Sequence, residues 1–246
     1  DVWAGKVVWN SGKVKSAQSQ LVSCADAALE KDRHYTWRVR VWDEADTPSA
    51  WSESSDFSIL TSEAAFAGSE WIGAITRKDA HLPEGRKYHG SELKKPEAKA
   101  AWAAVDTLAK KSIYLRREFY VAKKVKDATA YVCGLGFYEF SLNGEKVGDS
   151  EFAPLWSDYD KSVYYNTYDV TSQVKKGGNA IGVLLGNGFY NVQGGRYRKL
   201  QISFGAPTLR FRMVVNYEDG TCETIVSGKD WKYDFSPVLF NCIYGG

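Results

Sequence analysis

Alternating apolar and polar residues mark the first strand that the sequence predicts. In the stretch YTWRVRVWD, one face of an extended chain is apolar and consists of Tyr35, Trp37, Val39 and Val41. The opposite face is largely polar and carries Thr36, Arg38, Arg40 and Trp42. Because successive side chains of a strand point to opposite sides of a sheet, we expect the first face to be buried. A Pro-marked turn and a short closing strand with Phe57 and Ile59 complete a unit of short strands over residues 1–60.

The order of these features, a long alternating strand and then a Trp-Ser turn, resembles the second half of a fibronectin type III-like sandwich. Such a sandwich takes about 100 residues and seven strands. Residues 1–60 are too few for all of them. We therefore expect a partial fibronectin type III-like domain here, with its first strands upstream of Asp1.

A polar stretch at residues 61–70 is predicted to link this unit to a second domain over residues 71–246, which Trp71 opens. Within the second domain, residues 76–111 form an insertion rich in Lys, Ala and Glu. The segment AKAAWAAVDTLAKK has weak helical periodicity, so the insertion is predicted either to hold a short helix or to be partly mobile.

From Ser112 onward, short strand patterns follow one another with regular turn signals. The clearest turn is Asn143-Gly144, because this pair favours the positive φ angles that a tight hairpin requires. Asn143 is accordingly interpreted as a turn residue rather than a ligand. The pattern predicts an all-β fold in which a jelly-roll (galactose-binding-like) β-sandwich follows the partial domain.

Composition excludes some partners and leaves others open. The chain has 32 Lys plus Arg against 30 Asp plus Glu, so no overall field favours nucleic acid or an anionic membrane surface. No apolar run approaches the roughly 18 residues that a membrane-spanning helix needs. The cysteines form no CxxC pair and are predicted to be free, mostly buried thiols: Cys24, Cys133, Cys222 and Cys242.

Motifs for catalysis are missing from the sequence. It contains no GxSxG, no phosphate-binding loop and no HExxH. A pair of carboxylates for glycoside hydrolysis meets in space rather than in sequence, so spacing alone neither finds nor excludes one. The sequence therefore nominates no catalytic residue.

The acidic and aromatic loop at 149–160 and the turn at 186–190 are the candidates for binding. Flat rings stack on sugar faces, and carboxylates and amides hydrogen-bond to hydroxyl groups. The predicted carbohydrate-binding residues are Asp149, Trp156, Asp158, Tyr159, Asn187, Phe189 and Tyr190. Calcium takes six to eight oxygen ligands, and Asp158 and Asp160 are the candidate metal ligands. The competing interpretation is an acidic loop solvated at the surface, with Trp156 packed beneath it.

Five motifs in this region carry a family resemblance. They span Gly136 to Glu139, Leu142 to Asp149, Ala153 to Tyr159, Tyr165 to Thr171 and Leu185 to Tyr190. In this order they are similar to the N-terminal β-sandwich domain of bacterial α-L-rhamnosidases. Two positions depart from the family pattern, with Leu155 in place of Gly and Phe189 in place of Trp.

The resemblance implies a non-catalytic N-terminal segment of a larger enzyme that hydrolyses terminal α-L-rhamnose from glycans or glycosides. Its catalytic carboxylates would lie on an (α/α)6 barrel outside these residues. In some family members the matching sandwich binds rhamnose with calcium. The implied partners are a rhamnose-containing carbohydrate and the catalytic domain of the same polypeptide, with no nucleic acid and no membrane. No cofactor is required, and calcium is the one candidate ion.

Two roles remain open for the sandwich. It either binds carbohydrate or is a purely structural domain that packs against the barrel. The sequence leaves the compartment open, and a periplasmic or secreted location is favoured over the cytoplasm.

Overall fold

The structure, a computed structural model, describes residues 7–24, 27–29, 33–59, 62–83, 87–194 and 200–244. The chain divides into two compact units, residues 1–65 and 66–246. The boundary lies inside the stretch 61–70 that was expected to be a linker.

The elements of the first unit are β1 (Arg33–Trp37), β2 (Ser55–Ile59) and α1 (Ser62–Ala65). The second unit begins with β3 (Ile72–Gly73), β4 (Lys87–His89), the 3-10 helix η1 (Gly90–Lys94), α2 (Pro96–Ala103) and the 3-10 helix η2 (Thr107–Lys110). It continues with β5 (Ile113–Val121), β6 (Val125–Leu135), β7 (Phe137–Leu142), β8 (Glu145–Lys146), β9 (Asn166–Asp169) and β10 (Gly177–Gly186). The last strands are β11 (Asn191–Val192), β12 (Leu200–Ser203), β13 (Thr208–Tyr217), β14 (Cys222–Val226) and β15 (Lys232–Phe235).

In the first unit, β1 and β2 form an antiparallel pair in which Tyr35 stands opposite Phe57, with ring centroids 5.5 Å apart. The prediction of a buried apolar face is wrong beyond this pair. The exposed fractions are 48% for Trp37, 52% for Val39 and 67% for Val41. Within the described residues of this unit, the only sheet is the two-stranded one, so no facing sheet covers these side chains.

The opposite face of the same stretch, expected to be polar, is the better packed one. The Cζ atoms of Arg38 and Arg40 each lie 4.7 Å from the centroid of the Trp51 ring. Arg40 also lies over Trp42, at 4.9 Å. Cations over aromatic faces are attracted by the ring quadrupole, so this ladder holds residues 38–51 together.

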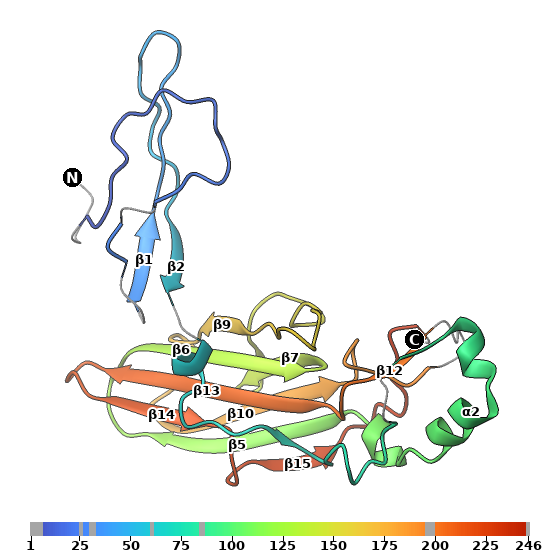
Figure 1. The fold of residues 1–246 in the computed structure, drawn as a ribbon. Helices are drawn as coiled ribbons and strands as arrows, with labels where there is room; N and C mark the ends of the chain where they lie inside the picture. Colours follow the sequence, from blue (N-terminus) through green and yellow to red (C-terminus); the bar gives the residue numbers. More distant parts are fainter. Residues whose placement is uncertain are drawn as a thin grey trace. The chain divides into compact units, whose positions relative to one another are not determined.

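The second unit is a β-sandwich (Figure 1). One sheet has the order β15-β5-β10-β7-β8, and the other has the order β14-β13-β6-β9, with β3 paired to β13. Strands β10 and β13 alternate between buried and partly exposed residues along most of their length. That period of two is the signature from which strands were predicted here, and the all-β prediction is confirmed.

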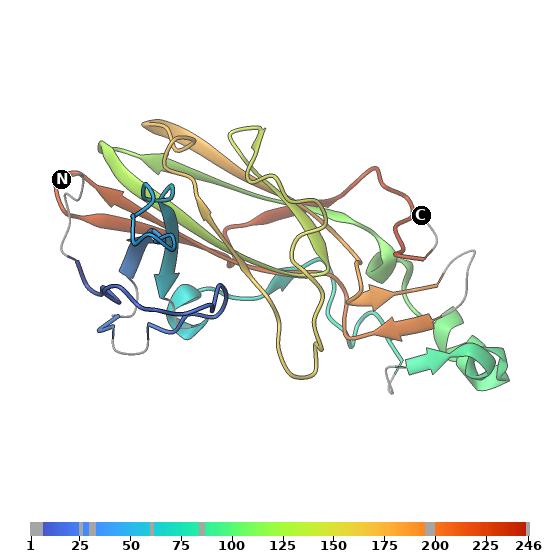
Figure 2. The ribbon, with the colours of Figure 1, turned by 90° about the horizontal axis from the view of Figure 1, so that it is seen from above.

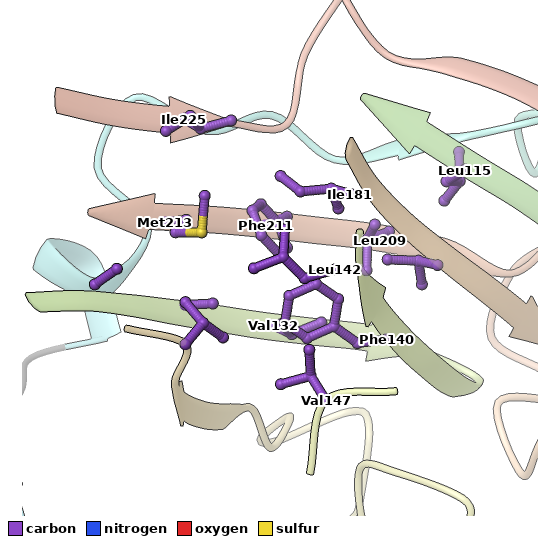
Figure 3. Close-up of a cluster of buried hydrophobic side chains, with 14 of the residues drawn as sticks. Leu115, Val132, Phe140, Leu142, Val147, Ile181, Leu209, Phe211, Met213 and Ile225 are labelled. Atoms are coloured by element: carbon purple, nitrogen blue, oxygen red, sulfur yellow. The ribbon is translucent and has the colours of Figure 1, made fainter. Parts of the chain in front are cut away.

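The core lies between the two sheets (Figure 3). Phe140 of β7 packs edge-on against Phe211 of β13, with ring centroids 5.5 Å apart, and both side chains are buried. Leu142, Ile181 and Leu209 are fully buried around them. Burial of an apolar side chain of this size contributes about 1.5–3 kcal/mol, so this cluster fixes how the sheets face each other.

The insertion at 76–111 contains the predicted short helix as α2, which buries Trp102. Trp102 belongs to a small cluster of its own, together with Leu82 and Val105. The four cysteines are free, as predicted, but only Cys133 and Cys242 are buried, so the expectation that most are buried is wrong for Cys24 and Cys222.

Candidate functional site

The loop between β8 and β9 carries most of the candidate residues and projects beyond the strands (Figure 2). It is anchored to β7, because the Tyr138 N–H donates a hydrogen bond of 2.6 Å to the Ala153 carbonyl. Ala153 and Pro154 are buried. Their neighbours are not, since the exposed fractions are 69% for Phe152, 79% for Leu155 and 60% for Trp156. We call these three exposed residues the apolar ridge.

Ring contacts support the ridge from beneath. Trp156 packs on Phe189, with centroids 5.4 Å apart, and Phe152 packs on Phe137 at 5.6 Å. Phe189 also meets Phe137 edge-on at 6.0 Å. The turn after β10 therefore supplies the ring on which the loop's Trp156 rests, and the predicted residues Trp156 and Phe189 are brought together.

Tyr159 and Tyr190 form a second aromatic group with Phe204. The Tyr159 ring meets Tyr190 at 5.1 Å and Phe204 at 5.2 Å. Burial raises the pKa of the Tyr159 phenol to about 12, so this hydroxyl is neutral at physiological pH. The two tyrosines are brought together as well, with their rings engaged by each other rather than fully open to a ligand.

Asn187 lies in the interior, with 1% of its surface exposed. Its Nδ2 donates to the Lys110 carbonyl at 2.9 Å, and its Oδ1 accepts a hydrogen bond of 2.8 Å from Asn191. A buried amide engaged at both ends has a structural role. The expectation that Asn187 binds a sugar hydroxyl is therefore corrected.

The acidic residues of the loop are exposed. Asp158 pairs with Lys161, with 3.0 Å between Oδ2 and Nζ. The pKa of the Lys146 ammonium group is raised, mainly by its hydrogen bond with Glu151. Asp149 lies near Lys146 and adds a smaller effect in the same direction. The neighbours of these two carboxylates are thus lysines of the same loop region.

A calcium ion does not fit this arrangement well. Within the described residues, no three His, Cys, Asp or Glu side chains come close enough together to hold a metal. Asp158 and Asp160 are two carboxylates, and the Lys161 ammonium at Asp158 would repel a cation. Calcium requires six to eight oxygen ligands, and two side chains leave most of them to be supplied from elsewhere.

Sequence reasoning missed three aromatic residues: Phe152 of the ridge, Phe137 beneath it, and Phe204, which packs on Tyr159. Phe137 and Phe204 come from strand ends far away in the chain, and their contacts depend on the folded topology. Phe152 had a local signal, because it directly precedes the Ala-Pro pair that anchors the loop.

Comparison with known proteins identifies the sandwich. The family described as the α-L-rhamnosidase N-terminal domain matches residues 123–246, just over half of this chain of 246 residues. The chain belongs to the α-L-rhamnosidase N-terminal domain family. Residues 2–60 match the Rha78A-like N-terminal immunoglobulin domain.

Relatives of this family match along nearly the whole chain. The curated α-L-rhamnosidase of Formosa agariphila is 37% identical over an alignment of 244 residues, and the match covers 97% of this chain and 25% of that protein. The solved structure of the α-L-rhamnosidase of Dictyoglomus thermophilum matches with a TM-score of 0.68 and 32% identity, over 97% of this chain and 24% of that one. This chain thus spans about a quarter of the length of these α-L-rhamnosidases.

The structure of the Streptomyces avermitilis α-L-rhamnosidase complexed with L-rhamnose has a TM-score of 0.72 at 24% identity, over 96% of this chain and 36% of that one. At this identity the match shows a shared fold.

None of the helices in the described part of the chain is long and apolar enough to cross a membrane.

Proposed function

We propose that this chain is the non-catalytic N-terminal segment of an α-L-rhamnosidase, and that the apolar ridge packs against the catalytic part of the same polypeptide. The parent enzyme would remove terminal α-L-rhamnose from glycans or glycosides. The rhamnosidase activity of the parent enzyme is proposed from relatives whose chains are about four times as long as this one. No residue of this chain is assigned a catalytic role.

One observation carries the docking role. Phe152, Leu155 and Trp156 are each more than half exposed and adjoin one another on one loop. Contiguous apolar surface rimmed by polar residues is typical of an interface rather than of a free surface. An aromatic side chain that fills a pocket of the partner is the residue type that most often dominates such an interface.

Carbohydrate binding at the same loop is the second candidate. The favouring observation is the Trp156 ring, which is 60% exposed and has the Asp158 carboxylate two residues away. Tyr159, Phe189, Tyr190 and Asp149 would then be supporting residues, without Asn187. A rhamnosyl end is the expected ligand. A periplasmic or secreted location would give such an enzyme access to external glycans.

Substitution of Trp156 in the full-length polypeptide separates these candidates. If the ridge docks, Trp156→Ala weakens the interface by about 2 kcal/mol or more. Limited proteolysis would then release the N-terminal segment faster, and its thermal transition would separate from that of the catalytic part. Tyr120→Ala is the matched control, because Tyr120 is an aromatic residue of β5 with 68% of its surface exposed.

Titration calorimetry with L-rhamnose provides the other readout. A binding heat that disappears in Trp156→Ala, with unchanged proteolysis, would favour the sugar site over docking. If Trp156→Ala resembles Tyr120→Ala in both measurements, the ridge has neither role.

A further inference from the structure

A groove opens along one edge of the sandwich, between the two sheets. Its volume is about 540 Å3, within the range of about 300–1,000 Å3 that small-molecule sites occupy. One wall comes from Trp71 and the adjoining strand β3, which pairs with β13 of one sheet. The other wall comes from Lys232 and Tyr233 of β15, the edge strand of the other sheet.

Two aromatic rings stand exposed in these walls, one from each side. The exposed fraction is 43% for Trp71 and 52% for Tyr233. Figure 1 shows the chain that follows α1 running beside the strands toward β15, which brings these distant residues into one groove. Neither position was singled out in the sequence as a binding residue.

Both rings are held in place by contacts outside the groove. The Arg210 guanidinium carbon lies 5.9 Å from the Trp71 ring centroid, and Arg210 is fixed in turn by a hydrogen bond of 2.9 Å from its Nε to the Ser69 hydroxyl. Tyr233 packs edge-on against Phe235 at 6.1 Å. Rings ordered before binding lose less conformational entropy when a ligand stacks on them.

Trp231 also lines the groove and is fixed in the same way. Its Nε1–H donates to the Val226 carbonyl at 2.9 Å, and its ring packs on Phe211 of the core at 5.3 Å. Because its one polar atom is already engaged, Trp231 presents an apolar surface to the groove.

Charged groups of both signs line the same groove. The ammonium group of Lys232 is exposed and has no ion-pair partner among the described residues. Asp79 accepts a hydrogen bond of 2.6 Å from Thr76 at Oδ2, which leaves lone pairs on the carboxylate for a ligand. Arg77 is engaged elsewhere, since its guanidinium donates to the carbonyls of Ser203 and Pro83.

We propose that this edge groove binds a saccharide. Trp71 and Tyr233 would stack on the apolar faces of pyranose rings, while Lys232 donates to ring hydroxyls and Asp79 accepts from them. A groove lined by a carboxylate, an ammonium group and aromatic rings suits a polyhydroxylated, uncharged ligand better than an anion or an apolar molecule. The groove is open along the sandwich edge, which suits a residue within a glycan chain rather than an enclosed small molecule.

The groove is distinct from the apolar ridge, although aromatic residues connect the two. Tyr190 and Phe204 line its inner end, and both touch Tyr159 of the loop. The saccharide proposal does not depend on docking by the ridge. Only the choice of a rhamnoside as probe rests on the proposed function.

The test is a calorimetric titration of the full-length polypeptide with methyl α-L-rhamnoside, in the wild type, Trp71→Ala and Tyr233→Ala. The catalytic site of the proposed enzyme would supply one class of site, and the groove would supply a second, weaker one. Each substitution is expected to lower the affinity of the second class about tenfold, while kcat on an aryl α-L-rhamnoside stays unchanged. Tyr120→Ala, outside the groove, should leave both classes unaltered.

Three results would overturn the proposal: a single class of sites in the wild type, a second class that Trp71→Ala and Tyr233→Ala leave intact, or a second class removed by Trp156→Ala but by neither groove substitution. The last result would place sugar binding at the loop. Lys232→Gln tests whether the charge of this residue matters, because it keeps a hydrogen-bond donor and removes the charge. For an uncharged saccharide it should weaken binding less than Trp71→Ala does.

Discussion

The backbone N–H of Asn187 donates a hydrogen bond to Oδ1 of Asn241, with 2.6 Å between the two heavy atoms. Asn241 also donates from Nδ2 to the Ser112 hydroxyl at 2.8 Å. These bonds fasten the segment after β15 to the turn after β10 and to the residue that precedes β5. The turn that supports Trp156 through Phe189 is thus fixed by a buried amide network rather than by apolar packing alone.

Removal of the Asn187 amide should destabilise the fold. Asn187→Ala removes the shorter of two hydrogen bonds to the Lys110 carbonyl, which keeps only the 3.4 Å bond from Asn241. It also removes one of the two acceptors of the Asn191 amide, the other being the Ala109 carbonyl. We expect the free energy of unfolding to fall by about 1–3 kcal/mol in urea denaturation. Asp149→Ala, an exposed substitution, should change it by less than about 0.5 kcal/mol. Equal stability of Asn187→Ala and the wild type would contradict the role assigned to this network.

Asn143 is a turn residue whose side chain has a second role. Its φ of 55° and the φ of 85° at Gly144 match the tight hairpin predicted from Asn-Gly. In addition, its Nδ2 donates to the Gln173 carbonyl at 2.9 Å, and its Oδ1 accepts from the Ala180 N–H at 2.9 Å. Asn143→Gly keeps the positive φ accessible but loses both bonds, so we expect a loss of about 1–3 kcal/mol in the same measurement.

Gly144→Ala is the matched control for this turn. No atom lies within 4 Å of the position that a Cβ would take, so backbone strain alone should cost about 1–2 kcal/mol. If Asn143→Gly left stability unchanged, turn geometry would be the whole role of Asn143.

What the sequence could predict was local. The period of two in β5, β10 and β13 and the Asn-Gly turn depend on neighbouring residues, and these strands formed as expected. The burial of Val39 was mispredicted because alternation shows that a face is apolar but not whether a second layer covers it. Asn187 was misjudged for a related reason, since its partner Asn241 is 54 residues away in the chain.

The candidate site divides in the same way. The stretch 149–160 was recognised as an aromatic and acidic loop from its residues alone. The contact between Trp156 and Phe189 could not be derived, because it joins the loop after β8 to the turn after β10, two strands away in the same sheet. The walls of the edge groove likewise come from β3 and β15, which are separated by most of the second unit.

Calcium should have little effect on this chain. The Lys161 ammonium occupies the neighbourhood of the Asp158 carboxylate, so binding of calcium there would have to displace an ion pair. Millimolar calcium is expected to leave the thermal midpoint of the wild type unchanged, and magnesium serves as the control ion. A rise in midpoint with calcium alone that is lost in both Asp158→Ala and Asp160→Ala would establish the site.

The buried thiol of Cys133 should make stability depend on alkaline pH. Burial raises its pKa from an ordinary 9.0 to about 12, against a smaller opposing effect of Arg210. Above about pH 9 the unfolded chain loses this proton while the folded chain keeps it, so the folded state binds more protons and the free energy of unfolding falls as pH rises. The thiol's contribution is complete below pH 9 and disappears toward pH 12, with a slope of up to about 1.4 kcal/mol per pH unit.

Urea unfolding between roughly pH 8 and 10 measures this slope, since tyrosines contribute mainly at higher pH. The slope should be shallower in Cys133→Ala than in the wild type. It should be unchanged in Cys222→Ala, whose thiol is exposed and serves as the control. Equal slopes in all three proteins would mean that the Cys133 thiol ionises as readily in the folded state as in the unfolded one.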